Sequence, residues 1–204
     1  MTGPYPGFPV GGQFGTIVCD PPWPYRNGPK GTLRVTPYAS MTEGEIFHLP
    51  VGDAAARDSV LLLWTTNAHI GLAVECLRHW GFVQKTMLTW VKTTRTGRPR
   101  PGIGLWPRGS TEHAILAVRG HPPTPRARSK GGEKMPTYTT AIMERPSRHS
   151  EKPRAVITMM EHIGPGPRLE LFARRRRAGW TAWGNELATT VETTLQPTLA
   201  EVPA

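Results

Sequence analysis

The chain has 204 residues, of which 38% are hydrophobic, and this suffices for one domain with a single core and long loops. Basic residues outnumber acidic ones by 25 to 15, and the formal net charge of +10 favours a polyanionic partner such as nucleic acid. The two cysteines form no C-x-x-C pair, which excludes a disulfide framework and a zinc signature, and the longest apolar run, residues 60–64, is too short to span a membrane.

The first quarter of the chain alternates turn-rich and apolar stretches. Residues 1–15 are rich in glycine and proline and are predicted to be irregular. Residues 16–20 predict a short buried strand. A loop is expected over 24–41, and a Thr-x-x-Glu capping box predicts a short helix over 42–49 with Thr42 as its N-cap.

Two further strands flank an amphipathic helix in the middle of the chain. The apolar run 59–66 predicts a buried strand, and Asn67 is the expected N-cap of the helix that follows. Apolar residues at helical spacing predict that helix over 68–80. The segment 82–91 predicts another strand, after which residues 92–112 form a basic loop rich in glycine and proline.

The last part of the chain repeats this alternation. Residues 113–119 predict a strand, and residues 120–134 a basic loop. A weaker strand signal covers 139–145. A helix is predicted over 152–163, with a proline near its start and a glycine at its end, and 168–173 predicts a strand.

Strands that alternate with helices predict an α/β fold with a mostly parallel central sheet and helices on both faces. Its domain would span 16–187, between the irregular N-terminal segment and a flexible C-terminal tail, 188–204. Ligands of such sheets bind beyond the carboxyl ends of the strands. We therefore expect Asp20, Asn67 and Arg174, which follow predicted strands, to converge on one cleft.

The sequence Asp20-Pro21-Pro22-Trp23 directly follows the first predicted strand. Two prolines make the backbone rigid and remove two amide donors. A carboxylate and a fixed carbonyl that both accept from an NH₂ group could orient an exocyclic amine such as adenine N6, and the tryptophan could stack on the base. The alternative is a proline-rich turn with a packed tryptophan.

Eight sequence blocks follow one another in an order typical of a known family. They are DPPW (20–23), PYASMTEGEI (37–46), LLLWTTN (61–67), CLRHWGF (76–82), LTWVKT (88–93), RGSTEHAILAVRG (108–120), SRHSEKP (147–153) and GPGPRLELFARRRRAGWTAWGNEL (164–187). On these blocks the chain resembles the MT-A70 family of adenine-N6 methyltransferases. The resemblance implies a Rossmann-like methyltransferase fold and S-adenosylmethionine as the cofactor.

The resemblance also implies roles for single residues on the substrate side. The catalytic residues would be Asp20, Pro21, Pro22 and Trp23. Asp20 and the Pro21 carbonyl would hold the adenine amine, and Trp23 and Tyr38 would contact the target base. Tyr38 could instead simply pack. The basic loops would supply further substrate contacts, among them Arg98 and Arg100.

On the cofactor side, Lys152 would meet the carboxylate of S-adenosylmethionine. The other residues assigned to cofactor binding are Asp20, Glu170, Phe172, Arg174, Asn185 and Glu186. Three of these residues have a stated structural alternative: Lys152 could be a solvated charge, Glu170 could pair with an arginine, and Asn185 could close a turn. The pocket for the cofactor's adenine stays undecided near residues 1–15, and no metal is expected.

Other aromatic and partner assignments complete the expectations. Trp64, Trp80 and Trp90 are assigned to the core, and His113 to a structural role on its strand. DNA is favoured over RNA by analogy with small microbial and phage members of the family. A monomer or homodimer is expected, in the cytoplasm of a bacterial or phage-infected host cell. The rival functions are an inactive nucleic-acid-binding partner subunit and, more weakly, a dehydrogenase.

Overall fold

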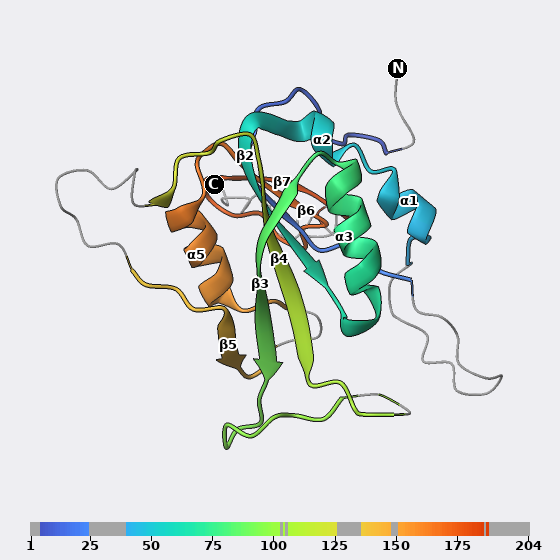
Figure 1. Cartoon of the computed structure of the whole chain (residues 1–204), viewed down its shortest axis with the longest axis vertical. Helices are drawn as coiled ribbons and strands as arrows, with labels where there is room; N and C mark the ends of the chain where they lie inside the picture. Colours follow the sequence, from blue (N-terminus) through green and yellow to red (C-terminus); the bar gives the residue numbers. More distant parts are fainter. Residues whose placement is uncertain are drawn as a thin grey trace, which may run out of the picture.

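The computed structural model describes residues 5–24, 40–102, 104, 106–125, 136–147, 151–185 and 187. Seven strands of this described part form one sheet in the order β5-β3-β4-β2-β1-β6-β7 (Figure 1). The strands are β1 (Phe14–Cys19), β2 (Ala55–Thr65), β3 (Val83–Lys92), β4 (Thr111–Arg119), β5 (Ala141–Glu144), β6 (Arg168–Leu171) and β7 (Trp180–Trp183).

The sheet is mostly parallel, as predicted, with one reversed strand. β1 pairs in parallel with β2 and β6, β6 with β7, and β3 with β5. β4 runs antiparallel to both of its neighbours, β2 and β3. The reversal was not predicted, and it places the first residues of β4 at the edge where all the other strands end.

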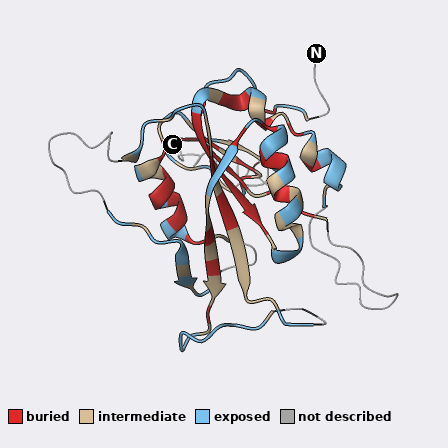
Figure 2. Ribbon diagram, viewed as in Figure 1, coloured by how far each residue is buried: buried red, intermediate tan, exposed pale blue. Residues whose placement is uncertain are grey.

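Helices cover both faces of the sheet, which confirms the predicted layering. They are α1 (Glu43–Phe47), α2 (Val51–Ala54), α3 (Ile70–His79) and α5 (Arg154–Ile163), with a 3₁₀ turn, η1, at Asn67–His69. Ile17 and Leu61 face the core under α1–α3, whereas Val18 and Leu62 face the core under α5. The strand segments between these layers are buried (Figure 2). The alternation follows from the period of two along a strand.

Local sequence patterns predicted the bounds of most helices and strands to within a few residues. Thr42 caps α1 and forms the predicted capping box with Glu45. Asn67, however, is not an N-cap: the cap positions of η1 and α3 are Thr66 and His69, and neither helix has a side-chain cap. The short elements α2 and β7 were not predicted, because four residues carry too little periodic signal.

The tryptophans assigned to the core are buried, with Trp64, Trp80 and Trp90 exposing 1%, 3% and 2% of their surface. Two of their indole nitrogens donate hydrogen bonds to backbone carbonyls. Trp80 donates to the carbonyl of Phe47 at 3.0 Å and Trp90 to that of Glu144 at 2.9 Å.

Within the described residues no helix is long and apolar enough to cross a membrane.

Gly164 ends α5 at a point where the backbone leaves no room for a side chain. A Cβ there would meet the Thr16 side chain and lie 2.8 Å from the carbonyl oxygen of Met160. We expect Gly164→Ala to lower the free energy of unfolding by about 1–3 kcal/mol, as overpacked sites do. Urea unfolding is the measurement. Gly71→Ala, where a Cβ meets nothing within 4 Å on α3, should instead raise stability, by about 0.5–1 kcal/mol. Equal losses in both variants would contradict the steric account.

Candidate active site

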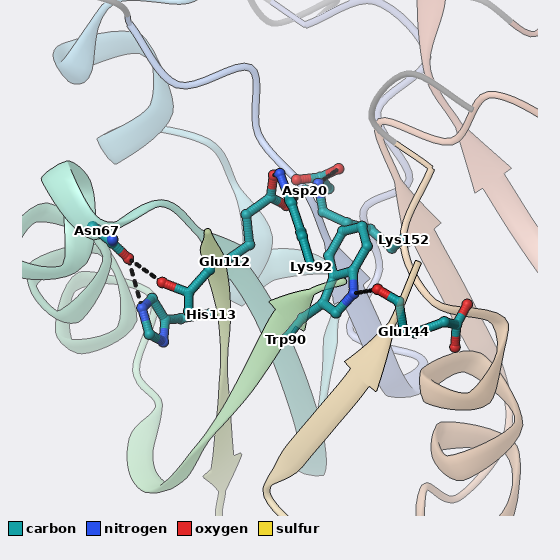
Figure 3. Close-up of polar contacts among 9 residues, drawn as sticks. Asp20, Asn67, Trp90, Lys92, Glu112, His113, Glu144 and Lys152 are labelled. Atoms are coloured by element: carbon teal, nitrogen blue, oxygen red, sulfur yellow. Dashed lines mark hydrogen bonds and ion pairs between the residues drawn. The ribbon is translucent and has the colours of Figure 1, made fainter. Parts of the chain in front are cut away.

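Four charged side chains meet at the carboxyl edge of the sheet (Figure 3). Asp20 directly follows β1, Lys92 is the last residue of β3, and Glu112 is the second residue of the reversed β4. Lys152 lies two residues before α5. Of the three residues expected to converge, Asp20, Asn67 and Arg174, only Asp20 belongs to this group. Lys92 and Glu112 are members that the sequence did not single out.

Acidic and basic groups alternate among these four residues, which we call the charge chain. The ammonium of Lys152 lies 2.7 Å from Oδ2 of Asp20 and 3.2 Å from Oε2 of Glu112. The other carboxylate oxygen of Glu112 pairs with the Lys92 ammonium. The Lys152 and Glu112 side chains expose only 18% and 16% of their surface, so these ion pairs are weakly screened by solvent.

At Glu112 and Lys152, the attraction of the oppositely charged neighbours together shifts the pKa more than burial does. Burial raises the pKa of Glu112, but Lys152 and Lys92 more than offset it, so the pKa lies below the ordinary range of a glutamate. Burial lowers the pKa of Lys152, while Asp20 and Glu112 raise it further, and the net pKa is above that of an ordinary lysine. Both groups are therefore ionised at neutral pH.

Two tryptophans fix the residues around Asp20. The Trp23 indole donates to the carbonyl of Trp64 at 2.9 Å, and its ring stacks on His69 with centroids 5.5 Å apart. The Lys152 ammonium lies over the Trp64 ring, 5.3 Å from its centroid, a cation–π contact. Trp23 itself exposes only 4% of its surface. In this structure it anchors the motif to β2, and its contact with a target base stays a prediction.

The two prolines of the motif present their carbonyls in different ways. The Pro21 carbonyl accepts from the Trp23 amide at 2.8 Å, and the Pro22 carbonyl accepts from the Met41 amide at 3.0 Å. A carbonyl oxygen can accept two hydrogen bonds, so Pro21 keeps capacity for one further donor. The elbow after β1 is thus held both by its own turn and by the segment before α1.

Asn67 and His113 form a second polar group beside the charge chain (Figure 3). The side-chain oxygen of Asn67 accepts from the Thr111 hydroxyl at 3.2 Å and lies 2.7 Å from Nε2 of His113. Nδ1 of His113 is 3.1 Å from the Thr89 hydroxyl. Burial lowers the pKa of His113, with Glu112 opposing, so the ring is neutral at neutral pH. Its hydrogen bonds match the structural role predicted for it.

The candidates in and after β6 range from half-buried to exposed. Glu170 pairs with Arg177 at 3.2 Å, the alternative that the sequence left open, and burial raises its pKa despite that arginine. Phe172 adopts a φ of 59°, rare for a bulky residue and typical of functional sites. Its ring meets Trp183 edge to face. Arg174 and Asn185 are exposed.

The remaining candidates lie on the segment between β3 and β4 or outside the described residues. Arg98 and Arg100 are exposed on the segment between β3 and β4. Tyr38 and Glu186 fall outside the described part of the chain, as does the tail 188–204. Among the described residues there is no group of three or more His, Cys, Asp or Glu that could hold a metal ion.

Lys92 and Glu112 were missed because their strands were predicted without a direction. The sequence does contain a signal: a lysine ends one apolar strand, a glutamate begins the next, and a loop joins them. A hairpin would bring the two together, with Trp90 of β3 opposite Glu112 of β4 as the structure shows. A parallel crossover, which the overall pattern favoured, would separate them.

Comparison with known proteins connects this chain to one group of enzymes. The profile of the MT-A70 family matches residues 14–186. The chain is 33% identical over 185 residues to the N(6)-adenosine-methyltransferase MT-A70-like protein of Arabidopsis thaliana, covering 86% of this chain and 24% of the relative. It is 30% identical over 190 residues to the N(6)-adenine-specific methyltransferase METTL4 of Mus musculus, covering 87% and 38%.

A third relative matches along most of its own length. The chain is 27% identical over 195 residues to the type II methyltransferase M.MunI of Mycoplasma sp, and the match covers 86% of this chain and 78% of that protein. By contrast, the chain spans about a quarter of the length of the plant relatives it matches. The shared region includes all four residues of the charge chain.

The charge chain should make stability depend on pH. We expect Glu112→Gln to lower the free energy of unfolding at neutral pH by about 3 kcal/mol, because Lys92 and Lys152 lose a buried partner. The folded pKa of Glu112 lies below its unfolded value of about 4.3, so its ionic contribution is complete above that pH and is lost as the pH falls through the folded pKa. The difference between variant and wild type should therefore shrink in acid.

Urea titrations across a pH series measure this difference. Glu75→Gln is the matched control, because Glu75 is exposed on α3 and its loss should change stability by less than about 0.5 kcal/mol. A deficit of Glu112→Gln that stays constant from neutral to acid pH would assign the effect to packing rather than to charge.

Proposed function

The chain belongs to the MT-A70 family, and we propose that it transfers a methyl group from S-adenosylmethionine to N6 of adenine in nucleic acid, with DNA the favoured polymer. The observation that carries this proposal is the placement of Asp20. The DPPW motif positions its carboxylate at the carboxyl end of β1, in contact with Lys152 of a second family block.

Asp20 suits the task of orienting an exocyclic amine. The N6 lone pair of adenine is delocalised into the ring, so the amine is a poor nucleophile that needs placement more than it needs a strong base. An ionised carboxylate has about four acceptor positions. The contact with Lys152 therefore leaves capacity for an N6–H donor, and the Pro21 carbonyl can accept the second N6–H. The amine loses one proton on methylation, and Asp20 is placed to accept it.

The donor groups at this edge fit S-adenosylmethionine. Lys152 has three N–H donors, of which Asp20 and Glu112 engage two, so one can reach the carboxylate of the cofactor. Asn185 offers an amide for hydroxyl groups and Phe172 an aromatic face. When bound, S-adenosylmethionine supplies the electrophilic methyl group. The charge chain then serves to hold Lys152 where it can meet the cofactor while Asp20 meets the amine.

The choice of DNA rests on the extent of the match. Among the three relatives described above, M.MunI is the one whose length the chain covers most fully, at 78%. By analogy with this type II methyltransferase we place DNA ahead of RNA. The net charge of +10 supports a nucleic-acid substrate of either kind.

Methyl transfer from labelled S-adenosylmethionine to pools of DNA and RNA, each single-stranded and duplex, tests the function directly. We expect label in N6-methyldeoxyadenosine after nucleoside analysis. Asp20→Ala should reduce the rate at least about 100-fold, the usual cost of a lost transition-state contact. It should still fold, because Lys152 keeps Glu112 as a partner. Asp53→Ala, an exposed carboxylate on α2, is the control.

Two outcomes would contradict the proposal. Near-wild-type turnover by folded Asp20→Ala would show that the Asp20 carboxylate has no part in the reaction. If the label is found only in RNA, the proposed methyl transfer is supported, but the choice of DNA as the substrate is wrong.

Cofactor binding can be measured without any turnover. We expect Lys152→Ala and Asn185→Ala each to weaken binding of S-adenosylmethionine, by about tenfold or more for the lysine, because a charge-assisted hydrogen bond is lost. Calorimetry on variants whose circular dichroism matches wild type is the measurement. Arg57→Ala, on β2, serves as a control that removes an exposed cation elsewhere. Unchanged affinity in both test variants would place the cofactor pocket away from this edge.

A further inference from the structure

The segment that joins β3 to β4, residues 93–110, projects from the carboxyl edge of the sheet, and we call it the arm (Figure 1). It carries Trp106, which exposes 91% of its surface. No other tryptophan among the described residues is so exposed, and most of the arm is exposed with it (Figure 2). An indole left in water loses the gain of burial, so a partner that covers it would be favoured.

Charge on the arm indicates what kind of partner this is. The arm contains four arginines and no aspartate or glutamate. The arginines, all exposed, are Arg95, Arg98, Arg100 and Arg108. An apolar protein surface would leave their charges without partners. A polynucleotide provides phosphates for the guanidinium groups and flat bases for the indole, at a regular short spacing.

The arm is held in shape by its own hydrogen bonds. Near its tip the Gly102 amide donates to the Gly109 carbonyl at 2.8 Å, and the Arg108 guanidinium donates to the Gly102 carbonyl at 2.7 Å. These bonds tie Gly102 to Arg108 and Gly109, on the two sides of Trp106 in the sequence. Side chains are also excluded there, because a Cβ on Gly102 would lie 2.5 Å from the Gly109 carbonyl oxygen.

The root of the arm is part of the candidate active site. The Arg100 amide donates to the Lys92 carbonyl at 2.7 Å, and the Lys92 amide donates to the Ser110 carbonyl at 2.8 Å. The Lys92 side chain pairs with Glu112, which follows the arm by two residues. A polymer held along the arm would therefore continue to the charge chain without leaving the protein surface.

We propose that Trp106 stacks on an unpaired nucleobase of the substrate strand while the arginines of the arm hold the flanking phosphates. The inference rests on the proposed function, since it gives that site its polymer contact. Trp106 is far more exposed than Trp23, and it would stack on a nucleotide beside the target rather than on the target base itself.

Binding to fluorescein-labelled single-stranded oligodeoxynucleotides, followed by anisotropy, tests the arm without any methyl transfer. Two probes of equal length are compared, one with bases throughout and one with a central run of abasic sites. We expect Trp106→Ala to weaken binding to the first probe by about tenfold, the effect of one lost stacking contact, and to leave binding to the abasic probe unchanged. Trp106→Phe should retain most of the affinity.

Two further variants separate stacking from charge and from general apolar exposure. Arg98→Ala should weaken binding to both probes alike, because both retain phosphates. Val83→Ala, at the opposite end of β3 and 63% exposed, should change neither. Equal binding of wild type and Trp106→Ala to the base-bearing probe would overturn the proposal, as would the absence of binding to either probe by wild type.

The outcomes distinguish this inference from the proposed function. If Trp106→Ala weakens binding only to the base-bearing probe and the protein transfers no methyl group, the stacking proposal for Trp106 is supported and the proposed methyl transfer is wrong. If the protein transfers the methyl group and Trp106→Ala binds both probes as wild type does, the proposed function is supported and the stacking proposal is wrong. If Trp106→Ala instead alters the sedimentation coefficient of the free protein with no change in oligonucleotide affinity, the arm contacts a second copy of the chain, and the proposal is wrong.

Discussion

The candidate site at the carboxyl edge of the sheet depends on one cation, the ammonium of Lys152, placed between the carboxylates of Asp20 and Glu112. Two carboxylates brought together in a half-buried position would repel each other, and one would take up a proton. Lys152 removes that conflict and keeps Glu112 ionised. It also joins the segment before α5 to the end of β1 and the start of β4, so three parts of the chain are fixed by one side chain.

The reversal of β4 supplies the second half of this arrangement. In a fully parallel sheet, the start of a strand lies at the edge opposite to its neighbours' ends. Because β4 is antiparallel to β2 and β3, Glu112 at its start lies beside Lys92 at the end of β3. The same reversal makes the connection between β3 and β4 a projecting arm at the carboxyl edge. One topological feature therefore provides both the central glutamate and the candidate polymer contact.

The rigid motif after β1 is held by packing as much as by its prolines. Trp23 is hydrogen bonded to the backbone of β2 and stacked on His69, and Trp64 of the same strand lies under Lys152. Aromatic residues that the sequence divided between site and core thus act together. Trp23 is the structural anchor of Asp20, and Trp64, although buried in the core, supports the cation that Asp20 contacts.

Sequence alone determined the elements and much of the site. Apolar runs and helical periodicity are local, so they located the main strands and helices, and the ordered motif blocks predicted Asp20 and Lys152 as candidate site residues. The sequence could not assign Lys92 or Glu112, the burial of Trp23, or the true partners of Asn67, which are Thr111 and His113 rather than a helix amide. The positions of Lys92 and Glu112 and the partners of Asn67 depend on the direction of β4. The burial of Trp23 depends on its long-range contacts with Trp64 and His69. Strand direction is set by which long-range pairing buries the most apolar surface and satisfies the most backbone groups, and only the tertiary structure decides that.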